Sequence, residues 1–97
     1  MKIVLIVHNV AIDEEVNELL RSLGIKHYTK FPDTLGWGKL SEPHLNTETW
    51  PGVNVGTFMP VEEDQADKIM DEIRELRKTL GKEGIRGFLI PLEKMTE

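Results

Sequence analysis

The chain alternates β-type and helix-type patterns in an order that few folds accommodate. A continuous β-rich run at Lys2–Val7 precedes one amphipathic helical pattern, and a second helical pattern after Pro60 precedes a last β-rich run that ends near Leu92. Two further segments with the two-residue alternation of strands lie between the helical patterns. The predicted order of elements is therefore strand, helix, strand, strand, helix, strand.

Each half of this order is a split β-α-β unit. Right-handed crossovers in both halves place the two helices on one face of a four-stranded antiparallel sheet. We therefore predict an α+β fold, the ferredoxin-like βαββαβ sandwich, as a single domain over residues 1–97. Lys2–Val7 is expected to be the central strand, because an uninterrupted apolar run is typical of a strand buried on both faces. The run is far shorter than the roughly 20 residues that span a bilayer, which argues against membrane insertion.

Both helices are predicted from their ends and their apolar spacing. The first covers Asp13–Leu23, with Asp13 as its N-cap and Gly24 as the left-handed residue that ends it. The second follows the acidic residues 62–64 and ends at Gly81. Apolar residues recur at helical spacing on one face of each helix, namely Val16, Leu19, Leu20 and Leu23 in the first, and Ala66, Ile69, Met70, Ile73, Leu76 and Leu80 in the second.

Side chains that alternate with a two-residue period predict the remaining strands. Pro32-Asp33 is expected to close or bend the second strand and Pro60 to stop the third, because proline lacks the N–H that a central ladder needs. The predicted bounds are Ile25–Phe31, Val53–Met59 and Ile85–Leu92 for the second, third and fourth strands.

The second face of the predicted sheet has no helix to cover it. Tyr28, Phe58 and neighbouring apolar residues are expected to populate this face. A large exposed apolar patch is unusual on a monomer. We therefore expect other copies of the chain to cover it in a homo-oligomer.

Charge and composition exclude several classes of function. A formal net charge of -5 argues against a nucleic-acid binder, which needs a basic surface to meet phosphates. The absence of cysteine excludes disulfides, thiolate nucleophiles, zinc fingers and iron–sulfur clusters. The first apolar run lacks the small-residue cleavage site of a signal peptide, so we expect a cytoplasmic protein.

Residues 32–52 join the second and third strands and show no hydrophobic periodicity. They contain both tryptophans, Trp37 and Trp50, and long loops of this kind in small domains usually bind something or are disordered. Gly36-Trp37-Gly38 is interpreted as a turn that cradles a ligand, with Trp37 stacked on a base or packed at a subunit boundary. The structural alternative is a bulged strand end that Trp37 anchors.

Several motifs occur in a characteristic order along the chain. They are Ile12-Asp13-Glu14-Glu15-Val16, Leu23-Gly24-Ile25, Thr29, Gly36-Trp37-Gly38 and Phe88-Leu89-Ile90-Pro91-Leu92-Glu93. Together with the long loop, this series resembles the PII-like superfamily of small trimeric signalling proteins, in which Gly-Phe-Gly stands at the place of Gly36-Trp37-Gly38. The resemblance covers most of the chain in element order and spacing.

The resemblance implies a non-enzymatic, homotrimeric protein of nitrogen regulation. A small anionic ligand such as a nucleotide is then expected in clefts between subunits, against Thr29, Gly36, Gly38 and Arg86, with Trp37 beside it. Glycines let backbone N–H groups approach a phosphate, and a guanidinium offers bidentate recognition. Residues 32–52 are expected to carry the signal to a protein partner.

Two alternatives stay open from the residues themselves. Glu42 and His44, joined across an interface by His8 or His27, are candidate ligands of a divalent transition metal on the same fold. In the second alternative, the chain is a small enzyme of the ferredoxin-like barrel type, with His8 or His27 as general base for an apolar substrate on the open sheet face. No spacing of serine and histidine indicates a catalytic triad, so the regulatory interpretation leads.

Overall fold

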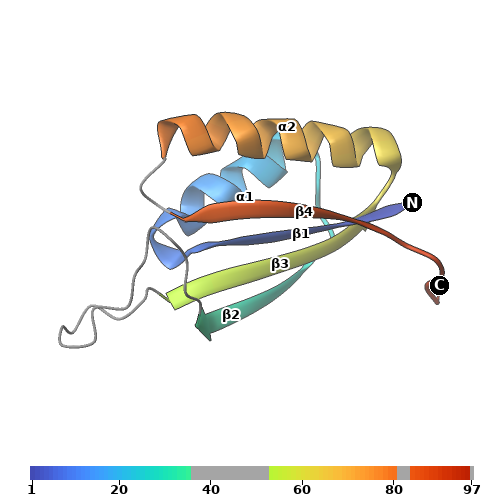
Figure 1. The fold of residues 1–97 in the computed structure, drawn as a ribbon, viewed down its shortest axis with the longest axis horizontal. Coiled ribbons are helices and arrows are strands. Elements are labelled where there is room, and N and C mark those ends of the chain that lie inside the picture. The colour runs from blue at the N-terminus through green and yellow to red at the C-terminus, as the bar shows by residue number, and fades with distance from the viewer. Residues whose placement is uncertain (36–52, 81–83, 97) are drawn as a thin grey trace.

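The computed structural model describes residues 1–35, 53–80 and 84–96 of the chain. Its elements follow the predicted order (Figure 1). They are β1 (Lys2–Asn9), the 3₁₀ turn η1 (Val10–Ile12), α1 (Asp13–Ser22), β2 (Thr29–Leu35), β3 (Val53–Val61), α2 (Glu63–Thr79) and β4 (Ile85–Pro91). Within these ranges, no helix is both long enough and apolar enough to cross a membrane.

The four strands form one antiparallel sheet in the order β2-β3-β1-β4. β1 is central, as predicted, because it pairs with β3 on one side and with β4 on the other. Val4 lies opposite both Met59 on β3 and Leu89 on β4, which defines the register of these strands. Both helices cover the same face of the sheet (Figure 1). The predicted ferredoxin-like βαββαβ fold is therefore confirmed.

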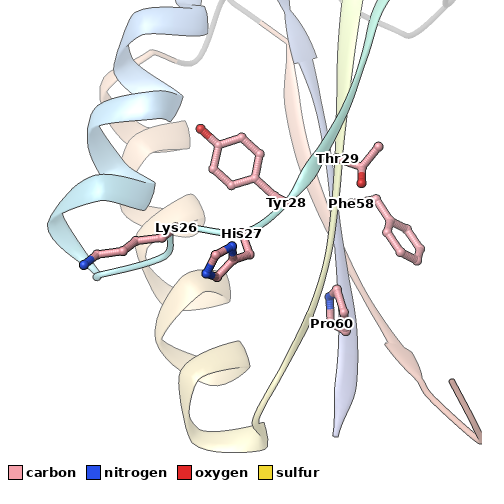
Figure 2. A pocket seen from close by; sticks show the side chains of 6 residues that line it. All are labelled: Lys26, His27, Tyr28, Thr29, Phe58 and Pro60. Carbon is pink, nitrogen blue, oxygen red and sulfur yellow. The ribbon is translucent and has the colours of Figure 1, made fainter. Parts of the chain in front are cut away.

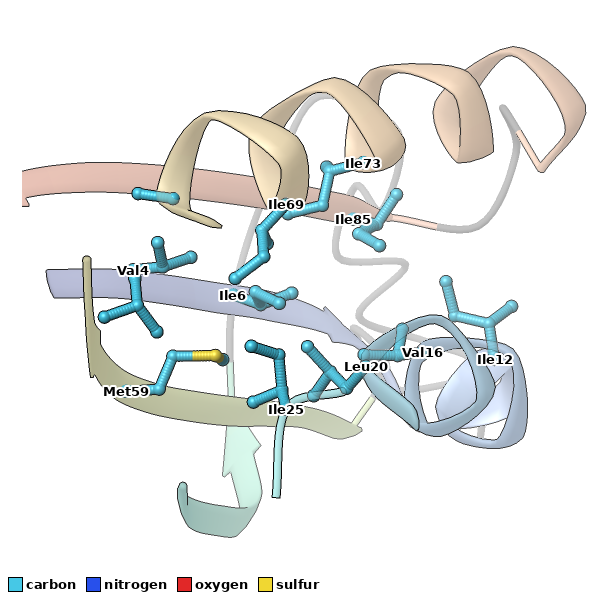
Figure 3. Close-up of a cluster of buried hydrophobic side chains, with 12 residues drawn as sticks. Val4, Ile6, Ile12, Val16, Leu20, Ile25, Met59, Ile69, Ile73 and Ile85 are labelled. Carbon is cyan, nitrogen blue, oxygen red and sulfur yellow. The ribbon is translucent and has the colours of Figure 1, made fainter. Parts of the chain in front are cut away.

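The hydrophobic core lies between the two helices and the face of the sheet that they cover, the inner face (Figure 3). β1 contributes Val4 and Ile6, both fully buried, because alternate residues of a strand point to the same side. Leu20 of α1 and Ile69 of α2 meet them from the apolar stripes of the helices. Burying each such side chain contributes about 1.5–3 kcal/mol, so this layer holds both helices on the sheet.

The start of α1 differs from the prediction at Asp13. Ile12 is the N-cap of α1 and makes no side-chain capping hydrogen bond. Asn9 caps the preceding turn η1, where its Oδ1 accepts a hydrogen bond from the Ala11 N–H at 2.8 Å. Asp13 is the first residue of α1, and its carboxylate contacts His8 and Lys30. The predicted N-cap at Asp13 is wrong because basic side chains of two strands occupy its oxygens.

β2 begins at Thr29 and not at the predicted Ile25. Gly24 adopts the predicted left-handed conformation after α1, with φ 77°, and Ile25 then turns into the core with 7% of its surface exposed. β2 also continues through Pro32-Asp33 to Leu35, across an irregularity in its pairing with β3 where Asp33 has φ 56°. Ile25 is thus apolar because it packs in the core, and the residues before Thr29 are not part of the strand.

β3 continues past its predicted end and includes Pro60. Pro60 lies opposite Ile3 of β1, whereas the pairing of β3 with β2 ends at Thr29 and Phe58. Pro60 therefore borders a free edge, where its missing N–H leaves no strand partner unpaired. The last strand, β4, ends at Pro91, one residue before the predicted Leu92.

The face of the sheet away from the helices, the open face, is apolar. Its residues follow from the register, because side chains that alternate with Val4 and Ile6 point to the opposite side. They include the half-buried Ile3, Leu5 and Val7 of β1, and Phe58, Phe88 and Ile90, which are 37%, 42% and 39% exposed. The expected uncovered apolar face, with Phe58 on it, is present in the single chain.

Gly87 of β4 packs directly against α2. A Cβ at this position would lie 2.7 Å from Ile73 Cδ1 and 3.3 Å from Met70 Sδ. We expect Gly87→Ala to lower the free energy of unfolding by about 1 kcal/mol, the lower end for added volume in a packed layer, because the ends of the Ile73 and Met70 side chains must shift. Urea unfolding followed by circular dichroism measures this loss.

Gly84→Ala is the matched control for this prediction, since a Cβ at Gly84 meets nothing within 4 Å. Both variants share the effect of Gly→Ala on the unfolded chain, about 0.4–1 kcal/mol. The difference between them therefore isolates the contact with α2. Equal stabilities of the two variants would contradict the close approach of β4 to α2.

Candidate functional site

A pocket of about 460 Å³ opens where β2 begins (Figure 2). Thr29 and Phe58 lie opposite each other in the β2–β3 ladder, and both line this pocket. It is a shallow hollow that is largely open to solvent, so a single chain encloses a ligand there only in part. The full lining consists of Lys26, His27, Tyr28 and Thr29 from the segment that enters β2, and of Phe58 and Pro60 from β3.

The exit of α1 exposes the segment that lines the pocket. The left-handed Gly24 turns the chain, and the Ile25 N–H donates to the Leu20 carbonyl at 2.9 Å. Because Ile25 is buried in the core, residues 26–28 cross from the helix to the strand at the surface. A glycine turn and a single apolar anchor thus position the pocket residues.

The pocket combines hydrogen-bond donors with aromatic surface. The Thr29 hydroxyl can donate to an anionic ligand, and Phe58 offers an aromatic ring on the same side of the strands. The Lys26 side chain extends away from these two residues on the helix side (Figure 2). Thr29 and Phe58 lie on the open-face side of the strands, whereas Tyr28 points toward the helix side (Figure 2). The prediction that Tyr28 populates the open face is therefore wrong, because Tyr28 and Thr29 are successive residues with opposite directions.

Arg86, the other predicted site residue within the described ranges, lies far from this pocket. It is exposed on β4 and lies opposite Val7, so it projects from the open face, as Thr29 does. β2 and β4 are the two outer strands, and three strand spacings of about 4.8 Å separate them by roughly 14 Å. One chain therefore does not bring Thr29 and Arg86 into a single pocket.

The remaining predicted site residues lie outside the described residues. These are Gly36, Trp37 and Gly38 of the expected ligand turn, and Glu42 and His44 of the metal alternative. In residues 1–35, 53–80 and 84–96, no group of three or more acidic or histidine side chains is arranged to hold a metal ion.

His8 lies on the inner face, and its side chain is fully buried. Its Nε2 lies 2.9 Å from Asp13 Oδ1, so the imidazole donates to this carboxylate in the tautomer with a proton on Nε2. Asp13 in turn accepts from Lys30 Nζ at 3.0 and 3.1 Å. Because the imidazole lies on the side of the sheet that the helices cover, His8 does not reach a substrate on the open face.

Burial and charge act on this cluster in opposite directions. Burial lowers the pKa of His8 below its usual value, although the hydrogen bond to Asp13 raises it. Burial raises the pKa of Asp13, but the hydrogen bonds from Lys30 and His8 outweigh that effect and hold the Asp13 pKa below its usual value. The cluster therefore favours a neutral imidazole beside an ionised carboxylate.

The sequence has the pattern of a known protein family. It matches a family model described as nitrogen regulatory protein P-II over residues 1–96. No curated protein matches the sequence at a significant level.

Solved structures with the same fold include proteins from Thermus thermophilus and Thiomonas intermedia. A PII-like signalling protein from Thermus thermophilus is 24% identical, with 91% of this chain and 82% of that chain covered and a TM-score of 0.66. CPII, a nitrogen regulatory PII-like protein from Thiomonas intermedia bound to ADP, AMP and bicarbonate, is 20% identical, with 92% and 84% covered and a TM-score of 0.66. Another structure of CPII with these ligands is 17% identical, with 92% of this chain and 88% of that chain covered and a TM-score of 0.69.

At these identities the solved structures establish the shared fold. The family model adds the sequence evidence, because it spans the chain from residue 1 to residue 96. The order of elements and the sheet topology agree with that match. The chain belongs to the nitrogen regulatory protein P-II family.

Proposed function

We propose that this protein is a non-enzymatic regulator that binds a small anionic ligand, an adenine nucleotide, in clefts between the subunits of a homotrimer. Residues 32–52 would pass the signal to a protein partner. The observation that carries the proposal is the pocket around Thr29 in a chain of the P-II family. The structures of CPII with ADP, AMP and bicarbonate support this choice of ligand.

The separation of Thr29 and Arg86 supports a site shared between subunits. Both residues project from the open face, but they belong to strands at opposite edges of the sheet. When copies of the chain meet through their open faces, the β2 edge of one can lie beside the β4 edge of another. A guanidinium from one subunit and a hydroxyl from its neighbour then act on one anionic ligand.

The apolar open face supports the homotrimer. Phe58 and Phe88 leave 37% and 42% of their surface exposed in the single chain, and burial of such rings is a strong driving force for association. Continuous contact among three sheets would remove these rings from water.

The path of β2 supports signalling through residues 32–52. Thr29 begins β2, and the strand continues to Leu35, where residues 36–52 follow. A ligand that binds one arrangement of this strand more tightly than another shifts the populations of both the strand and the segment beyond it.

Removal of the Arg86 guanidinium tests the shared site. We expect Arg86→Ala to weaken ADP binding by about 10- to 100-fold, since a hydrogen bond between charged groups contributes roughly 1.5–3 kcal/mol. Isothermal titration calorimetry of the assembled protein with ADP measures the dissociation constant. Arg74→Ala is the control, because Arg74 is an exposed arginine on α2 that pairs with Asp71. An unchanged affinity of Arg86→Ala would refute the placement of Arg86.

The Thr29 hydroxyl tests the pocket itself. We expect Thr29→Val to weaken ADP binding by about 10- to 100-fold, because the lost hydrogen bond runs to a charged acceptor and contributes roughly 1.5–3 kcal/mol. Thr79→Val, at the end of α2, is the matched control and should bind as the unmodified protein does. Equal affinities of the two threonine variants would place the ligand elsewhere.

Charge placed on the open face tests the assembly. Phe88 and Leu89 are neighbours on β4 with similar exposure, 42% and 39%, but they point to opposite faces. We expect Phe88→Glu to dissociate the oligomer, because the interface would bury an unpaired carboxylate, whereas Leu89→Glu should remain assembled. Sedimentation velocity measures the masses. A three-chain mass for folded Phe88→Glu would rule out this interface.

A further inference from the structure

Side chains from three elements meet in a polar cluster between the sheet and α1. His8 comes from β1, Asp13 and Asn17 from α1, and Lys30 from β2. Asp13 is the centre: its oxygens lie 2.9 Å from His8 Nε2, 3.0 Å from Lys30 Nζ and 3.3 Å from Asn17 Nδ2. Lys30 is the second residue of β2, so this carboxylate ties the start of an edge strand to the helix.

A single carboxylate in this cluster faces two basic groups. With His8 neutral, the charges of Asp13 and Lys30 balance. A proton on His8 adds a second positive charge, and its Nδ1 is buried without a hydrogen-bond partner, so the new N–H would be left unpaired. The His8 side chain is 0% exposed, whereas those of Asp13 and Lys30 are each 30% exposed. Lys30 can therefore move its ammonium into water, and His8 cannot.

The other elements around His8 offer no second acid in the part of the chain that is described. β3 presents Val55 opposite His8, and β4 presents Ile85. α2 brings a further cation near this place, since Arg77 donates to the Ile85 carbonyl. Burial and Lys30 disfavour a charged imidazole at His8, whereas Asp13 favours it.

We infer that Asp13 and Lys30 form a latch on β2 that protonation of His8 opens. When His8 is neutral, Asp13 holds Lys30 and keeps the start of β2 on α1. When His8 takes up a proton, it becomes the buried partner of Asp13 and repels Lys30, which turns to solvent. β2 is then held less firmly on α1. This strand carries both Thr29, which lines the pocket, and Lys30, which forms the latch.

The pH range of the latch follows from the direction of the pKa shifts. The pKa of His8 is lower in the folded protein than its usual value of about 6.5. The neutral imidazole is thus favoured by the fold, and its stabilisation is complete above about pH 6.5 and is lost as the pH falls toward the folded pKa. The Asp13 pKa is also lowered, so its own contribution is lost only below about pH 3.9. The latch therefore opens as the pH falls below about 6.5, before Asp13 begins to lose its own contribution at about pH 3.9.

Hydrogen exchange of the β2 amides at pH 7.5 and pH 5.0 tests the latch directly. After correction for intrinsic exchange, we expect protection in β2 to fall at the lower pH, with the amides of β4 unchanged as internal reference. The protection factors of the β2 amides should fall by up to about tenfold for each pKa unit by which His8 differs between the closed and the open latch. The His8 ring-proton shifts in NMR should titrate with the same midpoint, below about 6.5. Unchanged protection of β2 would overturn the inference.

Three variants separate the latch from a general effect of acid. His8→Gln keeps a donor but does not titrate, so its β2 protection should be equal at both pH values. His27→Gln removes an exposed histidine and should keep the acid response. Lys30→Met should raise the His8 midpoint, because the repelling ammonium is gone. An acid response that persists in His8→Gln, or an unchanged midpoint in Lys30→Met, would refute the latch. If His8→Gln does not fold, the acid response of the unmodified protein and the His8 midpoint of Lys30→Met test the latch.

Discussion

The alternation of side chains along β1 is the constraint on which the rest of the structure depends. Val4, Ile6 and His8 point to the inner face and are buried under the helices, whereas the residues between them point to the open face. Because β1 pairs with both β3 and β4, its register sets the direction of their side chains as well. One strand thus divides the protein into a helix-covered core and an apolar surface.

That division leaves a single chain incomplete in two respects. The open face exposes Phe58 and Phe88, and the groups suited to an anionic ligand lie at opposite edges of the sheet. Thr29 is on β2 and Arg86 on β4, with two strands between them. A sheet of this width does not fold its edges together, so contact between copies of the chain is the economical way to join them. In the proposed function, assembly and ligand binding then have the same physical origin.

The inner layer is mainly apolar, and the polar cluster at Asp13 and the buried Thr57 are the exceptions among the described residues. An ionised carboxylate and a buried imidazole cost free energy when they leave water, and only mutual hydrogen bonds offset that cost. The sequence did not reveal the cluster, because Asp13 and Lys30 are 17 positions apart and an acidic residue before a helix is commonly its N-cap. One signal was available: His8 continues the alternation of Val4 and Ile6, which indicates a buried histidine that needs a partner.

Local periodicity in the sequence was enough to determine the order of elements, the central place of β1, the Gly24 turn and an uncovered apolar face, because each depends on neighbouring residues. The resemblance pointed to Thr29, which lines the pocket. His27 was considered only as a metal ligand or a general base, and Lys26 was not singled out. The start of β2, the role of Asp13 and the distance between Thr29 and Arg86 were decided only by the tertiary structure. These features depend on which strand pairs with which and on ions far apart in the chain. A one-dimensional pattern does not contain such contacts, since they form only when the helices pack on the sheet.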